Sequence, residues 1–263
     1  MSLLRIESLR LGFGDGPDVL DGLSLELDAG QSLGLLGSSG SGKSMTALAV
    51  MGLLPPTATI RAGKIFFEGR DLLTLDPEER RLLRGGGIGL VFQEPFSALN
   101  PLMRVGDQIA EALALHQGLA YADAQREAAV WLERVGLTPG ASRARAYPHQ
   151  YSGGMRQRAL LAMALAGQPR LLIADEPTTA LDSTVQAQML QLIRALQSQM
   201  GFALIIISHD LAVIHALAEQ ALVLDHGHVA QRGSLSQMLQ APSCDALTRL
   251  LEAQAVLSAP QLA

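Results

Sequence analysis

A glycine-rich stretch near residue 40 matches the phosphate-binding loop pattern in full. It reads Gly37-Ser38-Ser39-Gly40-Ser41-Gly42-Lys43-Ser44, between a short apolar run and a helical pattern. Its glycines allow the backbone N–H groups to point at phosphate oxygens, and the helix N-terminus adds partial positive charge. We expect Lys43 to reach the β and γ phosphates and the Ser44 hydroxyl to bind Mg²⁺. A flexible turn is the alternative, but the chain has only two lysines, and one of them completes this pattern.

Two carboxylates follow an apolar run in the last third of the chain. Residues 171–174 predict a buried strand, and Asp175 and Glu176 follow it at the strand end where ligands bind in open α/β sheets. Asp175 suits Mg²⁺, directly or through water. Glu176 suits the attacking water, as a base or an orienting acceptor. Alone, the pair also fits a solvated loop. With the phosphate loop it indicates nucleotide hydrolysis without choosing among kinases, GTPases, motors and transport ATPases.

A second anion site is predicted at Ser152. This serine is expected to cap a helix that runs to Ala166, and Gly153-Gly154 leave the first N–H groups of that helix unshielded. An ordinary capped helix is the alternative. One nucleotide cannot easily use both helix ends of the same subunit. We therefore expect a head-to-tail pair of subunits, each lending its Ser152 turn to the phosphate loop of the other.

The elements that position these motifs follow from hydrophobic periodicity. A helix is expected from residue 44 to 54, stopped by Pro55-Pro56, and the pattern is helical from residue 95 to about 166. Trp131 is expected in its core, and a helical stripe of Val185, Met189, Leu192, Ile193 and Leu196 is expected to pack as core. Strands are expected at residues 3–11, 19–27, 32–36, 64–68, 88–92, 171–174, 203–207 and 221–224.

The composition restricts the class of protein. The chain has 263 residues, of which 48% are hydrophobic and 17% charged. This length and composition suit one large α/β domain with an inserted or appended subdomain and exclude a disordered chain. A net charge of −5 argues against nucleic acid as a partner. No apolar run approaches the roughly 18 residues of a membrane span, and the start lacks the pattern of a signal peptide. The single cysteine, Cys244, fits a reducing compartment.

The motifs resemble those of the ATP-binding subunits of ABC transporters. The likeness rests on Ser152 to Gln157, on residues 175–182, on Gln93 after the strand at 88–92, and on Ser208-His209-Asp210, and it covers about residues 3 to 233. Residues 92–101 and 147–151 are similar to the importer branch that serves di- and oligopeptides, nickel and metal chelates. Residues 242–251 weakly resemble its C-terminal signature. The short tail with one cysteine looks more like the nickel and metal-chelate members.

The resemblance implies an α/β fold: a P-loop NTPase (RecA-like) core with an N-terminal antiparallel β subdomain and an inserted α-helical subdomain. Residues 1–94 would form the first part of the core with the β subdomain, and 95–166 the helical signature subdomain. Residues 167–233 would complete the core, and 234–263 would form a short C-terminal helix and tail.

The resemblance also assigns roles. Phe13 would stack on adenine, Gln93 would touch Mg²⁺ or the water, His209 would contact the γ phosphate, and Asp182 would cross the dimer interface. Catalysis would use Lys43, Gln93, Glu176 and His209, and Mg²⁺ would be held by Ser44, Gln93 and Asp175. The nucleotide would be contacted by Phe13, the whole loop from Gly37 to Ser44, Met45, Gln93, Ser152, Gly153, Gly154, Gln157, Asp175 and Asp182.

Three of these side chains have simpler interpretations. Phe13 also fits a hydrophobic side chain at a hairpin tip, Gln93 a polar residue at a strand end, and His209 a solvated histidine. His226 and His228, which flank Gly227, suggest a strand-joining turn rather than a metal site.

The function implied is that of an ATP-hydrolysing subunit that powers uptake of a peptide, nickel or a metal chelate through a membrane importer. ATP and Mg²⁺ would be its cofactors. Its partners would be a second ATPase subunit, similar or identical, two permease subunits and an external solute-binding protein. The expected location is the cytoplasmic face of the inner membrane. The alternative is a soluble ABC ATPase that is not coupled to transport.

Overall fold

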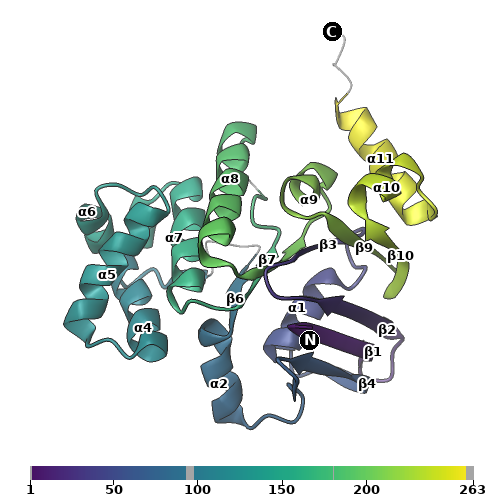
Figure 1. Ribbon diagram of the computed structural model, residues 1–263, viewed down its shortest axis with the longest axis horizontal. Helices are drawn as coiled ribbons and strands as arrows, with labels where there is room; N and C mark the ends of the chain where they lie inside the picture. Colours follow the sequence, from purple (N-terminus) through teal and green to yellow (C-terminus); the bar gives the residue numbers. More distant parts are fainter. Residues whose placement is uncertain (1, 93–97, 180, 259–263) are drawn as a thin grey trace. The chain divides into compact units, whose positions relative to one another are not determined.

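The computed structural model describes residues 2–92, 98–179 and 181–258, with side chains up to Ala253 (Figure 1). The chain forms two compact units. Unit 1 comprises Met1–Asp76 and Ala203–Ala263, and unit 2 comprises Pro77–Phe202. In the described residues, no helix is both long and apolar enough to cross a membrane.

Unit 1 contains an antiparallel sheet made from the first part of the chain. Its strands are β1 (Leu4–Phe13), β2 (Asp18–Leu27), β4 (Ala58–Phe67) and β5 (Arg70–Asp71), in the order β2-β1-β4-β5. Alternate side chains such as Ile6, Leu23 and Leu25 are buried, as expected for a sheet with one face on a core. The strands predicted for this region are confirmed, although β4 begins six residues before the expected start.

A second group of strands in unit 1 is mainly parallel. Strand β3 (Ser32–Leu36) pairs in parallel with both β8 (Ala203–Ile207) and β9 (Gln220–Asp225), and β10 (His228–Ser234) pairs antiparallel with β9. Every residue of β8 is buried, which explains its uninterrupted apolar sequence. The helices α1 (Lys43–Met51) and α9 (Leu211–Leu217) belong to the same unit.

The turn between β9 and β10 is the one expected at His226, Gly227 and His228. His226 and Gly227 have φ values of 48° and 83°, so both adopt the left-handed conformation typical of a tight hairpin turn. Among the described residues, no group of histidine, cysteine or acidic side chains is arranged to hold a metal ion. The interpretation of this pair as a turn is confirmed.

Two helix ends differ from the expectation. Helix α1 stops at Met51 because Gly52 adopts φ 62° and its N–H bonds to the Ala49 carbonyl, so Pro55 is not what ends it. The tail holds two helices, α10 (Leu235–Gln240) and α11 (Asp245–Ser258), where one was predicted. Pro242 separates them, and each buries apolar side chains, Leu235 in α10 and Leu247 in α11.

Unit 2 is mostly helical. Strands β6 (Ile88–Val91) and β7 (Leu171–Asp175) pair in parallel. Trp131 is 1% exposed, which confirms its expected place in the helical core, and Met189, Ile193 and Leu196 of the predicted stripe are buried. The helices are α2 (Pro77–Gly86), α4 (Val105–Gln117), α5 (Tyr121–Arg134), α6 (Gly140–Arg145), η1 (Pro148–Gln150, a 3₁₀ turn), α7 (Gly153–Ala166) and α8 (Ser183–Met200).

Close packing of α9 on β3 gives a stability prediction. A Cβ at Gly34 would lie 2.3 Å from Cγ2 of Ile214, so this strand residue must lack a side chain. We expect Gly34→Ala to lower the free energy of unfolding by about 1–3 kcal/mol through overpacking. The measurement is urea unfolding followed by circular dichroism. In an Ile214→Ala background the same change should cost much less, because the space is then open. An equal cost in both backgrounds would contradict the proposed packing.

Candidate functional site

The phosphate loop leaves β3 and enters α1 in the conformation that its glycines were expected to allow. Gly37, Gly40 and Gly42 have φ values of 153°, 79° and 104°. A Cβ at Gly42 would lie 2.5 Å from Cδ2 of Leu20, and a Cβ at Gly37 would lie 2.4 Å from the Leu224 carbonyl oxygen. Any other residue at these two positions would therefore collide with the surrounding fold.

Lys43 is folded over this loop. Its side chain is 8% exposed, and its Nζ donates to the carbonyl oxygens of Gly37 and Ser38 at 2.8 Å each. Helix α1 begins at Lys43 without a side-chain cap, so its first N–H groups are not satisfied by a capping side chain. The combination of a held ammonium group and an uncapped helix start suits a bound phosphate.

The other loop residues present polar groups. Ser38, Ser39, Gly40 and Ser44 are exposed, and Met45 is half-buried. Ser41 is 2% exposed, and no hydrogen bond to its Oγ occurs among the residues that the structure describes. The Ser44 hydroxyl in unit 1 and the Asp175 carboxylate in unit 2 are each oxygen donors of the kind that Mg²⁺ prefers, so the chemistry of each side chain fits this ion.

Phe13 and His209 also belong to unit 1. Phe13 ends β1 and is 39% exposed, which is high for a large apolar side chain. His209 follows β8 and is exposed. The preceding Ser208 is buried, and its N–H donates to the Leu35 carbonyl at 3.3 Å. This bond fixes the end of β8 beside β3, the strand that leads into the phosphate loop.

The acidic pair lies at the end of β7 in unit 2. Asp175 is 8% exposed, and Glu176 is half-buried with φ 48°, an uncommon conformation for a residue with a side chain. Thr179 Oγ1 donates to Glu176 Oε2 at 3.0 Å. Backbone strain of this kind is often found at functional sites, where the surroundings hold a side chain in one direction. The sequence analysis did not single out Thr179, although it follows Glu176 by only three residues.

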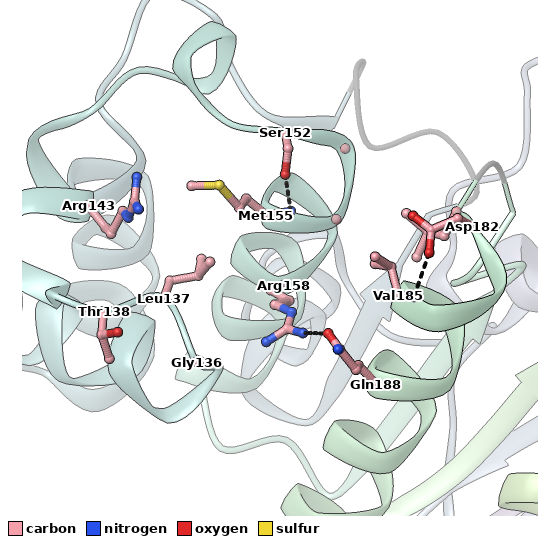
Figure 2. A pocket seen from close by; sticks show the side chains of 13 residues that line it. Gly136, Leu137, Thr138, Arg143, Ser152, Met155, Arg158, Asp182, Val185 and Gln188 are labelled. Atoms are coloured by element: carbon pink, nitrogen blue, oxygen red, sulfur yellow. Dashed lines mark hydrogen bonds between the residues drawn. The ribbon is translucent and has the colours of Figure 1, made fainter.

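A cavity of about 420 Å³ lies at the Ser152 turn, entirely within unit 2 (Figure 2). Helices α7 and α8 both begin at this cavity. Ser152 Oγ caps α7 by accepting from the Met155 N–H at 3.3 Å, and Asp182 Oδ1 caps α8 by accepting from the Val185 N–H at 2.9 Å. The cap predicted at Ser152 is confirmed. Two helix N-termini therefore direct partial positive charge toward one cavity.

Two arginines add to the positive charge of this cavity. Arg143 and Arg158 both line it (Figure 2). Arg158 donates to the Gln188 Oε1 at 2.8 Å and to the Val135 carbonyl at 3.3 Å, so it ties α7 to α8. Neither arginine was among the predicted site residues, although Arg158 directly follows the motif on which the resemblance rests.

Helix periodicity decides which signature residues face the cavity. Met155 lines it, three residues after the Ser152 cap, whereas Gln157 is 3% exposed and is not among the lining residues. Residues two positions apart on a helix point in nearly opposite directions, so the two cannot share a face. The role assigned to Gln157 stays a prediction, and Met155 is the signature residue that lines the cavity beside Ser152. Gln93 lies outside the described residues.

Tyr151, the residue directly before Ser152, links this turn to α6. It is 3% exposed and its hydroxyl donates to the Arg143 carbonyl at 2.9 Å. Burial raises the pKa of the Tyr151 hydroxyl to about 12, so it remains a hydrogen-bond donor at neutral pH. The bond joins the residue before α7 to α6, the helix that carries Arg143.

The chain is similar in sequence to known proteins. A family model described as ABC transporter matches residues 20–179. The chain is 42% identical over 244 residues to the oligopeptide transport ATP-binding protein OppD of Bacillus subtilis (strain 168), covering 91% of this chain and 68% of that protein. It is also 42% identical over 266 residues to the glutathione import ATP-binding protein GsiA of Salmonella typhimurium (strain LT2), covering 98% of this chain but only 43% of GsiA. The chain thus spans less than half the length of GsiA.

The fold has solved counterparts as well. The dimeric, post-hydrolysis structure of the ATP-binding cassette MJ0796 bound to ADP and Pi has a TM-score of 0.78 and 26% sequence identity, covering 88% of this chain and 98% of that one. The predicted fold class, an α/β protein with an antiparallel β part and a helical part, is confirmed. Since the family model matches more than half of the chain, the chain belongs to the ABC transporter family, as one of its ATP-hydrolysing subunits.

Proposed function

We propose that this chain binds ATP with Mg²⁺ between its own phosphate loop and the Ser152 turn of a partner ATPase subunit, and that hydrolysis drives a membrane importer. The observation that carries the proposal is the presence of two helix starts with glycine-rich sequences on one chain, α1 at Lys43 and α7 after Ser152. We expect a single triphosphate to use both when they come from different subunits. The partner is a second copy or a similar chain.

Each site residue has a separate role in ATP binding or hydrolysis in this proposal. Lys43 binds the terminal phosphates, and Phe13 offers its ring to the adenine. Ser44, Asp175 and Gln93 hold Mg²⁺, which when bound neutralises charge on the β and γ phosphates. Glu176 orients the attacking water, and His209 contacts the γ phosphate. The partner's copies of Ser152, Gly153, Gly154 and Asp182 close the site, with Arg143 and Arg158 adding positive charge.

Closure of the dimer follows from differential affinity. ATP favours the closed pair because only that state brings two sets of N–H groups to the same phosphates. Hydrolysis removes the bridging charge, and the pair reopens. Two permease subunits, joined to this cycle at the cytoplasmic face of the membrane, then change the side they face, and an external binding protein supplies the solute.

We further propose a peptide-class solute. OppD is described as an oligopeptide transport protein and GsiA as a glutathione import protein, and these relatives favour peptides over nickel or metal chelates. No observation on this chain favours a soluble ATPase that is not coupled to transport.

Lys43→Ala tests the phosphate loop. The buried ammonium is expected to supply a charge-assisted bond to phosphate, so its loss should weaken ATP binding by at least about tenfold. Isothermal titration with MgATP measures this. The matched control is Lys64→Ala, which removes the only other lysine, an exposed side chain on β4. Equal ATP affinity of the Lys43→Ala variant and the control would contradict the assignment.

Glu176→Gln tests catalysis separately from binding. Because Glu176 acts on the water, we expect turnover to fall by about 10²–10⁴-fold while ATP affinity is kept and an ATP-bound dimer accumulates. Phosphate release and light scattering measure the two effects. Glu219→Gln, an exposed change before β9, is the control. Normal turnover of the Glu176→Gln variant would remove the residue from this role.

Ser152→Arg tests the contribution made in trans. The large side chain blocks the N-terminus of α7, which we assign to the ATP site of the partner subunit, and it leaves the phosphate loop of the same chain unaltered. We expect the isolated variant to bind ATP with unchanged affinity and to hydrolyse none. The assays are nucleotide titration and phosphate release. Parallel loss of binding and hydrolysis would argue against a site completed by a partner.

A further inference from the structure

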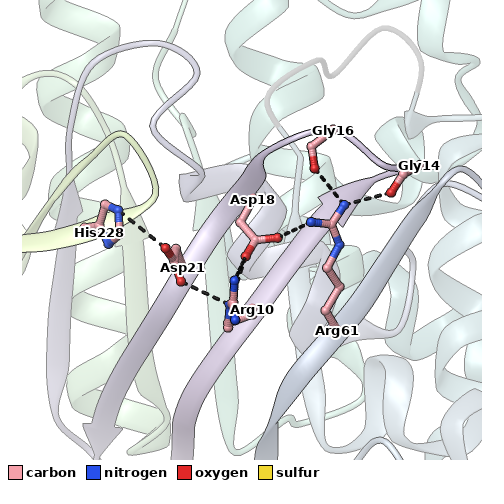
Figure 3. A network of polar contacts seen from close by, with 7 residues as sticks. All are labelled: Arg10, Gly14, Gly16, Asp18, Asp21, Arg61 and His228. Atoms are coloured by element: carbon pink, nitrogen blue, oxygen red, sulfur yellow. Dashed lines mark hydrogen bonds and ion pairs between the residues drawn. The ribbon is translucent and has the colours of Figure 1, made fainter.

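An ion-pair network lies at the turn that follows Phe13 (Figure 3). The Asp18 side chain, 6% exposed, is its centre and is bound from two sides. Arg10 contacts Asp18 Oδ2 at 2.7 Å, and Arg61 Nη1 donates to Asp18 Oδ1 at 2.6 Å. Both arginines therefore share one carboxylate, but they differ in what else they touch.

Only Arg61 reaches the turn itself. Its Nη2 donates to the carbonyl oxygens of Gly14 at 2.7 Å and Gly16 at 2.8 Å. The turn is also closed by the Gly16 N–H, which donates to the Phe13 carbonyl at 3.0 Å. One guanidinium thus holds two carbonyls of a turn in which Gly14 and Gly16 have no side chains of their own to restrict the backbone. Arg10 instead makes its other contact with Asp21 at 3.1 Å.

The backbone is arranged to bring Arg61 to this position. Arg61 lies on β4, where the pairing with β1 runs from Arg10 opposite Ala62 to Leu11 opposite Ile60 and leaves Arg61 without a register partner. Irregularities of this kind re-aim a side chain. A Cβ at Gly12 would lie 2.7–2.8 Å from Nη2 and Cζ of Arg61, so the guanidinium occupies the space over a residue that has no side chain.

The same turn is anchored beside the phosphate loop. Strand β2 begins just after it, and a Cβ at Gly42 of the loop would lie 2.9 Å from the Val19 carbonyl oxygen and 2.5 Å from Leu20 Cδ2. Strand β2 also contacts the turn between β9 and β10, since the Asp21 N–H donates to the Gly227 carbonyl at 2.9 Å. The first residues of β2 are therefore held by their neighbours, and Arg61 binds the turn that precedes them.

We propose that Arg61 is a positioning residue for adenine recognition: by holding the Gly14 and Gly16 carbonyls it fixes the turn after Phe13 and keeps the Phe13 ring at the nucleotide base. This inference rests on the proposed role of Phe13. The planar guanidinium group of Arg61 donates to the Asp18 carboxylate through Nη1 and to the two turn carbonyls through Nη2. Pre-ordering of the turn removes the entropy cost of arranging Phe13 when ATP binds.

The test compares ATP with tripolyphosphate, which occupies the phosphate loop but has no base. Phe13→Ala is expected to weaken MgATP binding by about tenfold through the lost stacking and to leave tripolyphosphate binding unchanged. Arg61→Ala is expected to weaken MgATP about three- to tenfold, also without effect on tripolyphosphate. In the double variant the loss should equal that of Phe13→Ala alone, because Arg61 acts only through Phe13.

Arg10→Ala is the matched control, since it removes the other arginine on Asp18 without touching the turn carbonyls, and it should leave both affinities unchanged. Arg61→Lys serves where Arg61→Ala lowers the yield of folded protein. Lysine keeps a charge near Asp18 but lacks the fork, so the selective loss for ATP should persist.

Three results would overturn the inference. Unchanged ATP affinity in Arg61→Ala, with a loss in Phe13→Ala, would leave the role of Phe13 standing and remove that of Arg61. Equal losses for ATP and tripolyphosphate in Arg61→Ala would show a general disturbance of the fold. Additive losses in the double variant would mean that Arg61 acts independently of Phe13. By contrast, unchanged ATP affinity in Phe13→Ala would refute the adenine role in the proposed function itself.

Discussion

The attraction between phosphate and the N-terminus of a helix is the interaction on which the proposed nucleotide site depends. Backbone N–H groups at a helix start carry partial positive charge and lack partners within the helix. The chain builds such a start behind β3, where Lys43 is held against the carbonyls of Gly37 and Ser38, and another at Ser152. Each start is a modest attraction alone. When both starts bind one triphosphate, nucleotide binding brings the two subunits together.

The rest of the fold serves to hold these helix starts and their neighbours in place. Buried parallel strands β3 and β8 fix where the phosphate loop departs, and the bond from Ser208 to Leu35 sets the position of His209. In unit 2, Arg158 bonds α7 to α8, and this bond helps to keep the Ser152 turn and the Asp182 cap at the same cavity. We propose this cavity as the surface that meets the nucleotide of the partner subunit.

Much of this could be predicted from the sequence because its signals are local. The glycines at 37 and 42, the apolar run before Asp175 and the Ser152 cap each depend on a few adjacent residues. Arg61 and Asp18 could not be found in that way, since they are 43 positions apart and meet only through strand pairing. The different orientations of Met155 and Gln157 could not be predicted either, because a motif does not say which face of a helix each residue occupies. The sequence analysis predicted one C-terminal helix instead of two, because the apolar residues on either side of Pro242 also fit a single short helix followed by a tail.

The most direct test of a nucleotide shared between two chains is complementation between two inactive variants. A chain with Lys43→Ala keeps an intact Ser152 turn, and a chain with Ser152→Arg keeps an intact phosphate loop. Head-to-tail pairing predicts that an equimolar mixture regains ATP hydrolysis, because each mixed pair contains one complete site. If the mixture, measured by phosphate release at saturating MgATP, stayed as inactive as its two components, the shared site would be contradicted.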